Sequence, residues 1–261
     1  MKNFNFKSAA NTKEASKFIT GRATFLAGGM TLLPAIKLRL AAYSDLINIK
    51  KIKSLSGIKV SSKSIRIGAI TTHADVASSK EVGKSIPSLA VLAEGIGDPQ
   101  VRNRGTIGGS IANNDPAADY PSACLALNAT IHTNKRKIQT DKFFKGMFET
   151  DLKKGELIEA IEFEVPEKSA YAKFPNPASR YAIAGVYVAK FKKEVRVAVT
   201  GVASSVFRCE KIEDILSKNF SPTAIDGVNI SSQGFNSDIH ASADYRAHLI
   251  KVMAKKAVAS C

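Results

Sequence analysis

Hydrophobic and polar positions change period several times along the chain, and each change predicts an element of secondary structure. Alternation, or a short apolar run between turn residues, is typical of strands. Such stretches occur at residues 4–9, 24–27, 46–49, 58–60, 64–69, 129–133, 137–140, 156–165, 182–191 and 194–203. Helical spacing or capping residues predict helices at residues 11–19, 31–40, 74–79, 87–94, 122–127, 211–218 and 242–259. The first fifty residues thus form a βαβ-like unit, and the pairs at 58–69 and 182–203 form hairpins.

Two details of this pattern bear on domain organisation. Composition changes at Pro166–Ser169, which predicts a domain boundary there. The last helix is amphipathic, and the residues predicted to lie on its apolar side are Tyr245, Leu249, Val252 and Met253. The chain therefore divides into a long first part and a shorter second part that ends in a helix.

A polar, glycine-rich stretch, Asn103–Pro121, lies between apolar segments. The adjacent Gly108 and Gly109 remove every Cβ from a predicted turn, so that backbone N–H groups can approach a bound anion closely. Thr106 and Ser110 add hydroxyl donors. Asp119 follows on a loop bracketed by prolines, where a carboxylate could accept a hydrogen bond from a sugar hydroxyl. We interpret this stretch as one wall of a site for a nucleotide pyrophosphate.

A second glycine pair has a similar setting. Gly28 and Gly29 follow the predicted strand at 24–27 and precede the helix predicted from Leu32, Ile36 and Leu40. Pro34 is tolerated only in a first turn, which places the start of that helix near Thr31. A strand, a glycine turn and a helix N-terminus together favour anion binding. One glycine pair usually only turns the chain, whereas two pairs could hold a diphosphate between them.

Composition narrows the classes of function. The chain has 261 residues, of which 44% are hydrophobic, so it can form one large or two ordinary domains with a real core. No apolar run is long enough to span a bilayer and the N-terminus has no apolar signal core, so we expect a soluble intracellular protein. The net charge is +15, but the lysines are scattered and no aromatic residues interleave with them. We interpret them as solvated faces, with an acidic protein partner or nucleotide steering as alternatives.

Cysteine and histidine usage argues against a metal centre in this chain. The three cysteines are far apart and show no C-x-x-C spacing: Cys124, Cys209 and Cys261. We therefore expect no zinc site and no iron–sulfur cluster held by this chain alone. No two histidines have metal-ligand spacing, and we expect all four to be surface or capping residues: His73, His132, His240 and His248.

The two glycine motifs, taken together, resemble a known family. They read Ala27-Gly28-Gly29-x-x-Leu32-Leu33-Pro34 and Thr106-Ile107-Gly108-Gly109-Ser110-x-Ala112-x-x-Asp115-Pro116-x-x-Asp119-x-Pro121. This combination resembles the FAD-binding subunit of molybdenum hydroxylases, a family that includes the carbon monoxide dehydrogenase medium subunit and, more distantly, the xanthine dehydrogenase FAD domain. The segment Ser242–Leu249 also resembles the last helix of that family, so the resemblance covers nearly the whole chain.

The resemblance implies a fold and a cofactor site. The fold would be α+β: a two-part FAD-binding domain of the vanillyl-alcohol-oxidase (PCMH) type at 1–168, with parts at about 1–53 and 54–168, and a smaller domain of antiparallel sheet and helices at 169–261. FAD would lie between the glycine loops, its diphosphate on their N–H groups. Carried over by motif, the cofactor-binding residues are Phe25, Leu26, Ala27, Gly28, Gly29, Met30, Thr31, Leu32, Thr106, Ile107, Gly108, Gly109, Ser110, Asp119, Leu157 and Lys173.

Within this implied site, Asp119 would hold ribityl or ribose hydroxyls, Leu157 would contact the flavin, and Lys173 would lie near the flavin ring. The chain departs from the family in two places. Met30-Thr31 follows the first glycine pair where Thr-Asp or His-Ser is frequent, and no acidic residue follows Arg180. The first change leaves backbone contacts intact but removes a side-chain contact. The second concerns the region that faces the flavin edge.

The implied function is electron transfer in an oxidoreductase complex. Substrate would be oxidised on a molybdopterin-containing large subunit, and electrons would pass through 2Fe-2S clusters of a small subunit to FAD here and then to an external acceptor. The flavin would supply the redox chemistry, so we name no catalytic acid or base and no metal ligand. We expect a cytoplasmic location, or the inner face of the membrane reached through the complex, and no nucleic acid. The alternatives are a stand-alone FAD oxidoreductase of the same fold and a non-enzymatic basic nucleotide-binding protein.

Overall fold

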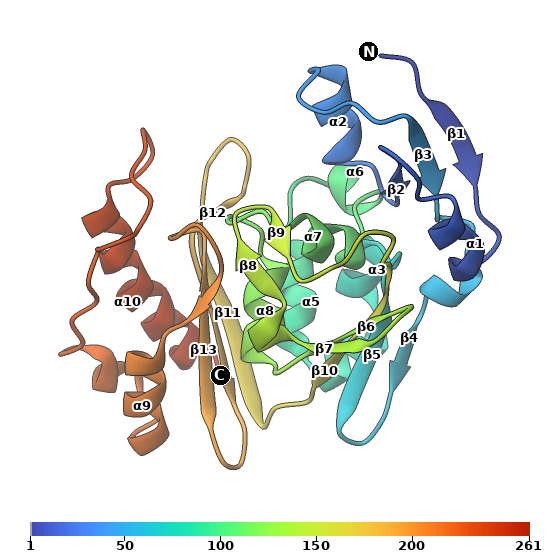
Figure 1. Ribbon diagram of the computed structural model, residues 1–261. Helices are drawn as coiled ribbons and strands as arrows, with labels where there is room; N and C mark the ends of the chain where they lie inside the picture. Colours follow the sequence, from blue (N-terminus) through green and yellow to red (C-terminus); the bar gives the residue numbers. More distant parts are fainter. Residues whose placement is uncertain (1) are drawn as a thin grey trace.

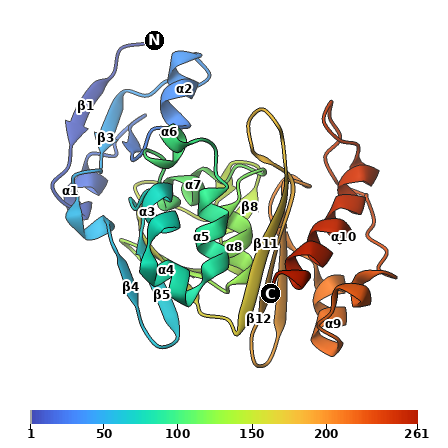
Figure 2. The same ribbon diagram turned by 180° about the vertical axis from the view of Figure 1, so that it is seen from behind.

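Three sheets follow one another along the chain in the computed structural model, which describes residues 2–261. The N-terminal lobe and the C-terminal helices lie at opposite ends of the molecule in both views (Figures 1 and 2). The middle sheet and its helices lie between them. Each sheet contributes to its own cluster of buried apolar side chains, so the fold has three cores in a row.

The N-terminal lobe is a parallel three-stranded sheet with the strand order β1-β3-β2. Its elements are β1 (Asn5–Ser8), α1 (Thr12–Lys17), β2 (Thr24–Leu26), α2 (Leu32–Lys37) and β3 (Asp45–Asn48). The Asn11 side chain accepts a hydrogen bond from the Glu14 N–H and so caps α1. The central strand β3 is buried, with Leu46 and Ile47 fully covered. The predicted βαβ-like unit is confirmed.

Helix α2 is shorter than the apolar spacing predicted. It ends at Lys37, and Arg39 adopts a left-handed backbone conformation with φ of 62°. Leu38 and Leu40 are consequently 70% and 79% exposed rather than packed on the lobe. The prediction of a helix through Leu40 was wrong because the chain turns back toward β3 before the helical repeat is complete.

The middle part is a five-stranded sheet, in the order β4-β5-β10-β6-β7, covered by short helices. Its strands are β4 (Ile58–Val60), β5 (Ser64–Gly68), β6 (Thr130–Thr133), β7 (Lys137–Gln139) and β10 (Ile158–Glu164). Its helices are α3 (His73–Ser78), α4 (Lys80–Ser85), α5 (Pro87–Glu94), α6 (Pro99–Arg102), α7 (Ile107–Asn113) and α8 (Tyr120–Ala126). The hairpin predicted at 58–69 is present as β4–β5, and the strands predicted at 129–133 and 137–140 pair as β6–β7. The alternation predicted for β10 is interrupted at Ala160 and Ile161, which are both buried, beside a register shift against β6.

The C-terminal sheet is antiparallel and is covered on both faces. It contains β11 (Lys168–Pro175), β12 (Ala182–Lys190), β13 (Val195–Thr200) and β14 (Phe207–Arg208). Tyr187 and Ala189 of β12 join the middle core beside α5 and α8, whereas Val186 and Val188 join the last core beneath α9 (Glu210–Lys218) and α10 (Ala243–Ala259). Figure 1 shows α9 and α10 on the outer side of this sheet. Strand β12 is therefore apolar at almost every position, as expected for a strand buried on two faces.

The last helix has its predicted apolar side except at one position: Leu249 and Met253 are buried and Val252 packs against the same core. Tyr245, predicted on that side, is 43% exposed, while Arg246 next to it is buried. The Arg246 guanidinium donates to the carbonyl oxygens of Ile183 and Gly201, both at 2.7 Å, and to Asp238. Both terminal nitrogens of this buried side chain have acceptors, which stabilises its charge in the interior, and apolar periodicity cannot reveal that.

Short elements complete the chain: the 3-10 turns η1 (Lys53–Leu55), η2 (Thr140–Lys142) and η3 (Pro222–Ile225), and the strand pair β8 (Phe144–Gly146) and β9 (Glu149–Thr150). Over the described residues 2–261, none of the helices combines the length and the apolar character that crossing a bilayer requires. The three cysteines are free thiols, two of them buried.

Candidate functional site

Both glycine pairs line one cavity of about 610 Å³ between the N-terminal lobe and the middle part. Gly28 packs so closely on the second stretch that an added Cβ would lie 2.0 Å from the Arg104 carbonyl oxygen. Only glycine allows this approach of two backbones. The cavity has the size of a site for a small ligand or cofactor, for which roughly 300–1,000 Å³ is usual.

Most of the predicted cofactor residues line this cavity: Phe25, Ala27, Gly28, Gly29, Met30, Thr31, Leu32, Thr106, Gly108, Gly109, Ser110, Asp119 and Leu157. Three do not. Ile107 is fully buried in the middle core, Leu26 lies in strand β2 behind the lining, and Lys173 reaches the site only through Asp119. These three residues support the wall rather than form it.

The first glycine loop presents free backbone donors to the cavity. Among residues 2–261, the N–H groups of the five consecutive residues from Gly28 to Leu32 donate to no protein acceptor. All five residues line the cavity. Thr31 occupies the N-cap position of α2, but its side chain makes no capping hydrogen bond. A run of unpartnered N–H groups is a suitable cradle for an anion.

The second glycine pair was predicted to form a turn between elements. It lies instead at the start of helix α7, within its first helical turn. The N–H groups of Ile107 and Gly108 donate to the carbonyl oxygens of Thr71 and Ala69, at 3.1 and 2.9 Å. The Gly109 N–H donates to the capping Thr106 hydroxyl oxygen at 3.1 Å. In this structure all three N–H groups donate to protein oxygens, unlike those of the first glycine loop. An added Cβ on Gly108 would lie 2.5 Å from the Ala69 Cβ, so this glycine serves close packing.

Asp119 stands at the start of α8 and is 5% exposed. Its carboxylate accepts hydrogen bonds from the Tyr171 hydroxyl and from the Lys173 ammonium, the latter at 3.0 Å. Burial raises the pKa of the Asp119 carboxyl above its ordinary value, and the neighbouring Lys173 and Tyr171 partly offset that rise. The carboxylate is therefore held in one place at the cavity wall and keeps further acceptor capacity.

Lys173 comes from β11 of the C-terminal sheet, a strand that the sequence did not predict. Its ammonium donates both to Asp119 and to the Gly95 carbonyl oxygen at 2.8 Å. The prediction that Lys173 belongs to the site rests on the resemblance. In the structure Lys173 does not line the cavity but contacts Asp119, which does. It ties the last sheet to the cavity wall.

Two histidines are buried, contrary to the prediction of surface or capping positions. His73, at the start of α3, is 5% exposed and lines the cavity. Burial lowers the pKa of His73 to about 4, with a smaller contribution from the Arg102 charge. Its ring faces Tyr120 with 5.3 Å between centroids. His132 is also buried and pairs with Glu162 at 2.7 Å.

The loop between β11 and β12 adds lining residues that the sequence did not single out. Ser179, Arg180 and Tyr181 all face the cavity. Arg180 has a φ of 62° and donates to the Gly97 carbonyl oxygen at 3.0 Å. The departure from the family after Arg180 was the one available signal for this loop. The cavity is thus closed partly by the C-terminal sheet.

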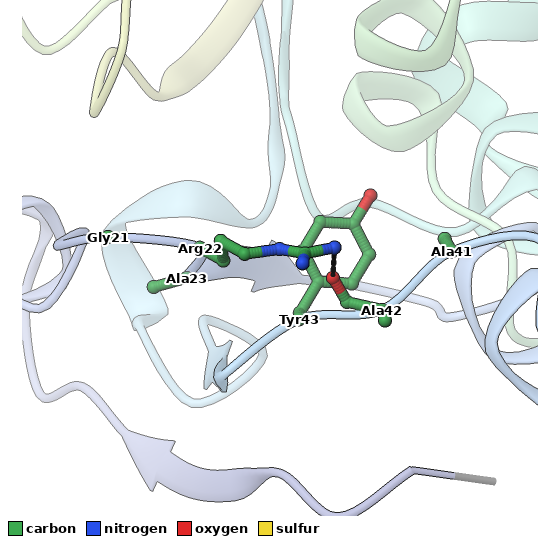
Figure 3. Close-up of a pocket in the computed structure, with 6 residues that line it drawn as sticks. All are labelled: Gly21, Arg22, Ala23, Ala41, Ala42 and Tyr43. Atoms are coloured by element: carbon green, nitrogen blue, oxygen red, sulfur yellow. Dashed lines mark hydrogen bonds between the residues drawn. The ribbon is translucent and has the colours of Figure 1, made fainter.

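A smaller cavity of about 360 Å³ lies beside the first one and is drawn in Figure 3. Arg22 crosses it and donates to the Ala42 carbonyl oxygen at 2.7 Å. Ala41 and Tyr43 line both cavities. The glycine loops line only the larger one, which is therefore the candidate site.

An α+β protein with two converging glycine segments, free backbone donors and a buried carboxylate belongs to the class that binds a nucleotide-derived cofactor. The family model described as "FAD binding domain in molybdopterin dehydrogenase" matches residues 2–167. That match covers more than half of the chain, so the chain belongs to this family.

Proteins similar over their whole length support the assignment. The glyceraldehyde dehydrogenase medium chain of Sulfolobus acidocaldarius is 36% identical, over 97% of this chain and 96% of that protein. The carbon monoxide dehydrogenase medium chain of Hydrogenophaga pseudoflava is 35% identical, over 90% of this chain and 88% of that protein. Among solved structures, carbon monoxide dehydrogenase from Hydrogenophaga pseudoflava matches with a TM-score of 0.88 and 32% identity, over 99% of this chain and 96% of that one. Reconstituted CO dehydrogenase from Oligotropha carboxidovorans gives a TM-score of 0.90 at 27% identity, over 99% and 97%.

The chain is therefore an FAD-binding medium subunit of the molybdenum-hydroxylase type of dehydrogenase, and its cofactor is FAD. The predicted family, the α+β fold and the oxidoreductase class are confirmed. The cavity fits this cofactor in kind, because it joins a run of free N–H donors to a buried carboxylate across one continuous space.

Proposed function

We propose that this subunit relays electrons within a molybdenum hydroxylase complex. Substrate is oxidised on a large subunit that carries molybdopterin, and a small subunit with 2Fe-2S clusters delivers the electrons to FAD in this chain. FAD supplies the redox chemistry, since it can accept electrons singly and pass them on to an external acceptor. The supporting observation is the convergence of both glycine motifs on one cavity within a family defined by FAD binding. Relatives named as medium chains of dehydrogenases support the multi-subunit setting.

The first glycine loop would hold the diphosphate. The free N–H groups from Gly28 to Leu32 supply several donors in sequence, and no protein group competes for them among residues 2–261. From the second motif, the Ser110 hydroxyl faces the cavity and adds a side-chain donor. The two motifs therefore have different tasks: the first binds the anion, and the second packs the wall behind it.

The buried carboxylate of Asp119 would accept hydrogen bonds from ribityl or ribose hydroxyls. Tyr171 and Lys173 fix its orientation, so a hydroxyl meets an acceptor that does not have to reorganise. Leu157, which is 5% exposed and lines the cavity, would give an apolar contact for the ring system. The apolar parts of the cavity exclude water from the cofactor, which strengthens each polar contact.

Met30 gives a direct test of the diphosphate site. It is exposed, lines the cavity and belongs to the run of free N–H groups, so the change Met30→Glu is compatible with the fold. The new carboxylate would occupy the free N–H groups and repel the diphosphate. Unit charges about 4 Å apart near a protein surface interact by about 4 kcal/mol, so we expect FAD affinity to fall by at least about tenfold.

The matched control is Met30→Gln, which has nearly the same shape as the Met30→Glu side chain and no charge and should change affinity by less than about threefold. Affinity is measured by titrating FAD into the cofactor-depleted protein and following flavin fluorescence. If both variants bind FAD like the unmodified protein, the first loop does not hold the diphosphate.

The wider proposal concerns the partners. The complex purified from its native cell should contain molybdenum, iron and FAD together with two further subunits. Metal analysis and mass spectrometry of the purified complex measure this. A chain that carries FAD but purifies alone, without either metal, would instead indicate a stand-alone flavin oxidoreductase.

A further inference from the structure

The formal charge of the protein is concentrated in its first quarter. Residues 2–66 contain 13 lysines and arginines but only 2 acidic residues, so they carry +11 of the net charge of +15. Among the described residues 2–261, Lys7 is the one member of this set that forms an ion pair, with Asp45 at 2.8 Å. The positive charge expected to be scattered thus gathers on the N-terminal lobe, at one end of the molecule, and on the adjoining β4–β5 hairpin of the middle sheet (Figures 1 and 2).

This basic lobe also forms one wall of the cofactor cavity. Ala35 and Ala41 line the cavity, and the segment between them carries Lys37 and Arg39 at exposed positions. Leu38 and Leu40 alternate with these cations and are among the most exposed apolar residues of the protein. A small apolar patch with a basic rim therefore lies at the edge of the FAD cavity. We call the segment 37–40 the rim segment.

The composition of this surface fits a transient partner better than a permanent one. Permanent interfaces are large and apolar, and lysine is depleted from their centres. Here the cations are many and unpaired, and the exposed apolar residues of the rim segment are few. Weak encounters between redox proteins use small contact areas, and charge complementarity steers them together. An acidic surface on the partner is the complement that this lobe requires.

We propose that the N-terminal lobe is the docking surface for an acidic, one-electron carrier protein that receives electrons from FAD, with the rim segment as its point of contact. This inference rests on the proposed electron-transfer function and names the chemical class of the external acceptor. Each encounter oxidises the reduced cofactor by one electron and reduces one carrier. Two carriers are reduced for each full reoxidation, and the protons released go to solvent.

The experiment compares two carriers of opposite charge. FAD-loaded, full-length protein is reduced with dithionite under argon and mixed in a stopped-flow instrument with the soluble domain of an acidic b-type cytochrome, or with a basic c-type cytochrome. We expect the second-order rate constant for the acidic carrier to fall at least about tenfold between low salt and about 0.5 M salt, because screening shortens the reach of the charges. The rate for the basic carrier should stay level or rise over the same range.

Charge reversal locates the docking surface. The double variant Lys37→Glu/Arg39→Glu should slow the acidic carrier at least about tenfold at low salt and not at high salt. The control Lys192→Glu/Lys193→Glu makes the same change in net charge at the exposed turn between β12 and β13 and should change the rate by less than about twofold. Neither pair lines the cavity, so FAD content should be unchanged in both.

Several outcomes overturn the proposal. One is equal salt dependence for the two carriers, and another is an equal loss in both double variants. A third is a preference for the acidic carrier that disappears in the native complex, since the lobe would then be covered by a subunit. A fourth is that Lys37→Glu/Arg39→Glu weakens the binding of DNA or of anionic lipid vesicles but leaves the rate of electron transfer to the acidic carrier unchanged. Failure to retain FAD would instead contradict the proposed function, and the flavin spectrum of each sample records that separately.

Discussion

Acidification should destabilise this protein through one buried histidine. His73 lies at the start of α3, packs beside Tyr120 and is 5% exposed. Its Nδ1 atom is buried, and no group among residues 2–261 forms a hydrogen bond with it. Because nothing compensates an added charge there, burial lowers the pKa of His73 to about 4 from an ordinary value of 6.5. The ring is therefore neutral at pH 7 in the folded protein.

The sign and size of the effect follow from proton linkage. The unfolded chain takes up a proton near pH 6.5, whereas the folded protein does so only near pH 4. Between these values the unfolded state holds more protons, so the free energy of unfolding falls as the pH falls. The difference in pKa corresponds to a loss of about 3 kcal/mol, complete once the pH is below both values. Such a loss is a large part of the stability of an ordinary domain.

The assay is urea unfolding at several pH values from 7.5 to 4, with and without added FAD, for the unmodified protein, His73→Gln and His240→Gln. Carboxylates titrate in the same range, so the informative quantity is the difference between the unmodified protein and each variant. For His73→Gln that difference should change by about 3 kcal/mol across the range, in favour of the variant at low pH. His240→Gln, at an exposed position, is the control for the loss of a histidine elsewhere. A constant difference for His73→Gln would refute the reasoning.

Two further changes test the cavity wall. Lys173→Met leaves the Asp119 carboxylate buried without its cation and should lower the free energy of unfolding by about 3–5 kcal/mol. Adding Asp119→Asn in the same chain should restore part of that loss. Urea unfolding measures both, and an equal loss in the single and the double variant would contradict this. Gly28→Ala places a Cβ 2.0 Å from the Arg104 carbonyl oxygen and should abolish FAD retention. The control is Gly83→Ala on helix α4, where a Cβ meets open space. This variant should keep FAD and raise the free energy of unfolding by up to about 1 kcal/mol. Flavin absorbance of the two purified glycine variants measures how much FAD each retains. Retention of FAD by Gly28→Ala would contradict the close packing of the two loops.

Local patterns in the sequence predicted the elements around the first glycine pair well. The features used there depend only on residues that are close together in the sequence: a strand, a glycine pair and a proline in a first helical turn. The structure has β2, the loop and α2 in that order. The hairpins and the capped helices were predicted for the same reason. The family resemblance depended on the residues and spacing of two separate motifs. Local secondary-structure propensity alone does not indicate a family.

The remaining features depend on partners far along the chain. Gly108 lies in a helix because its N–H donates to Ala69 and its missing Cβ leaves room for that residue. The buried Arg246 donates to the carbonyl oxygens of Ile183 and Gly201, which only the assembled sheet provides. The uneven charge of the first 66 residues was visible in the sequence. Its meaning needed the fold, which places these cations at one end beside the cavity.

The C-terminal sheet is part of the cofactor site rather than an attachment to it. The segment that leads into α8 carries cavity residues, and this sheet fixes it from behind. The Thr200 hydroxyl lies 3.0 and 2.7 Å from the carbonyl oxygens of Pro116 and Ala118, and the Gly201 N–H donates to Pro116 at 2.8 Å. With the ion pair to Asp119 added, the C-terminal sheet and the residue after β13 hold this wall of the cavity at several points. A cofactor that binds between lobes in this way stabilises both, so loss of FAD and loosening of the C-terminal sheet should accompany one another.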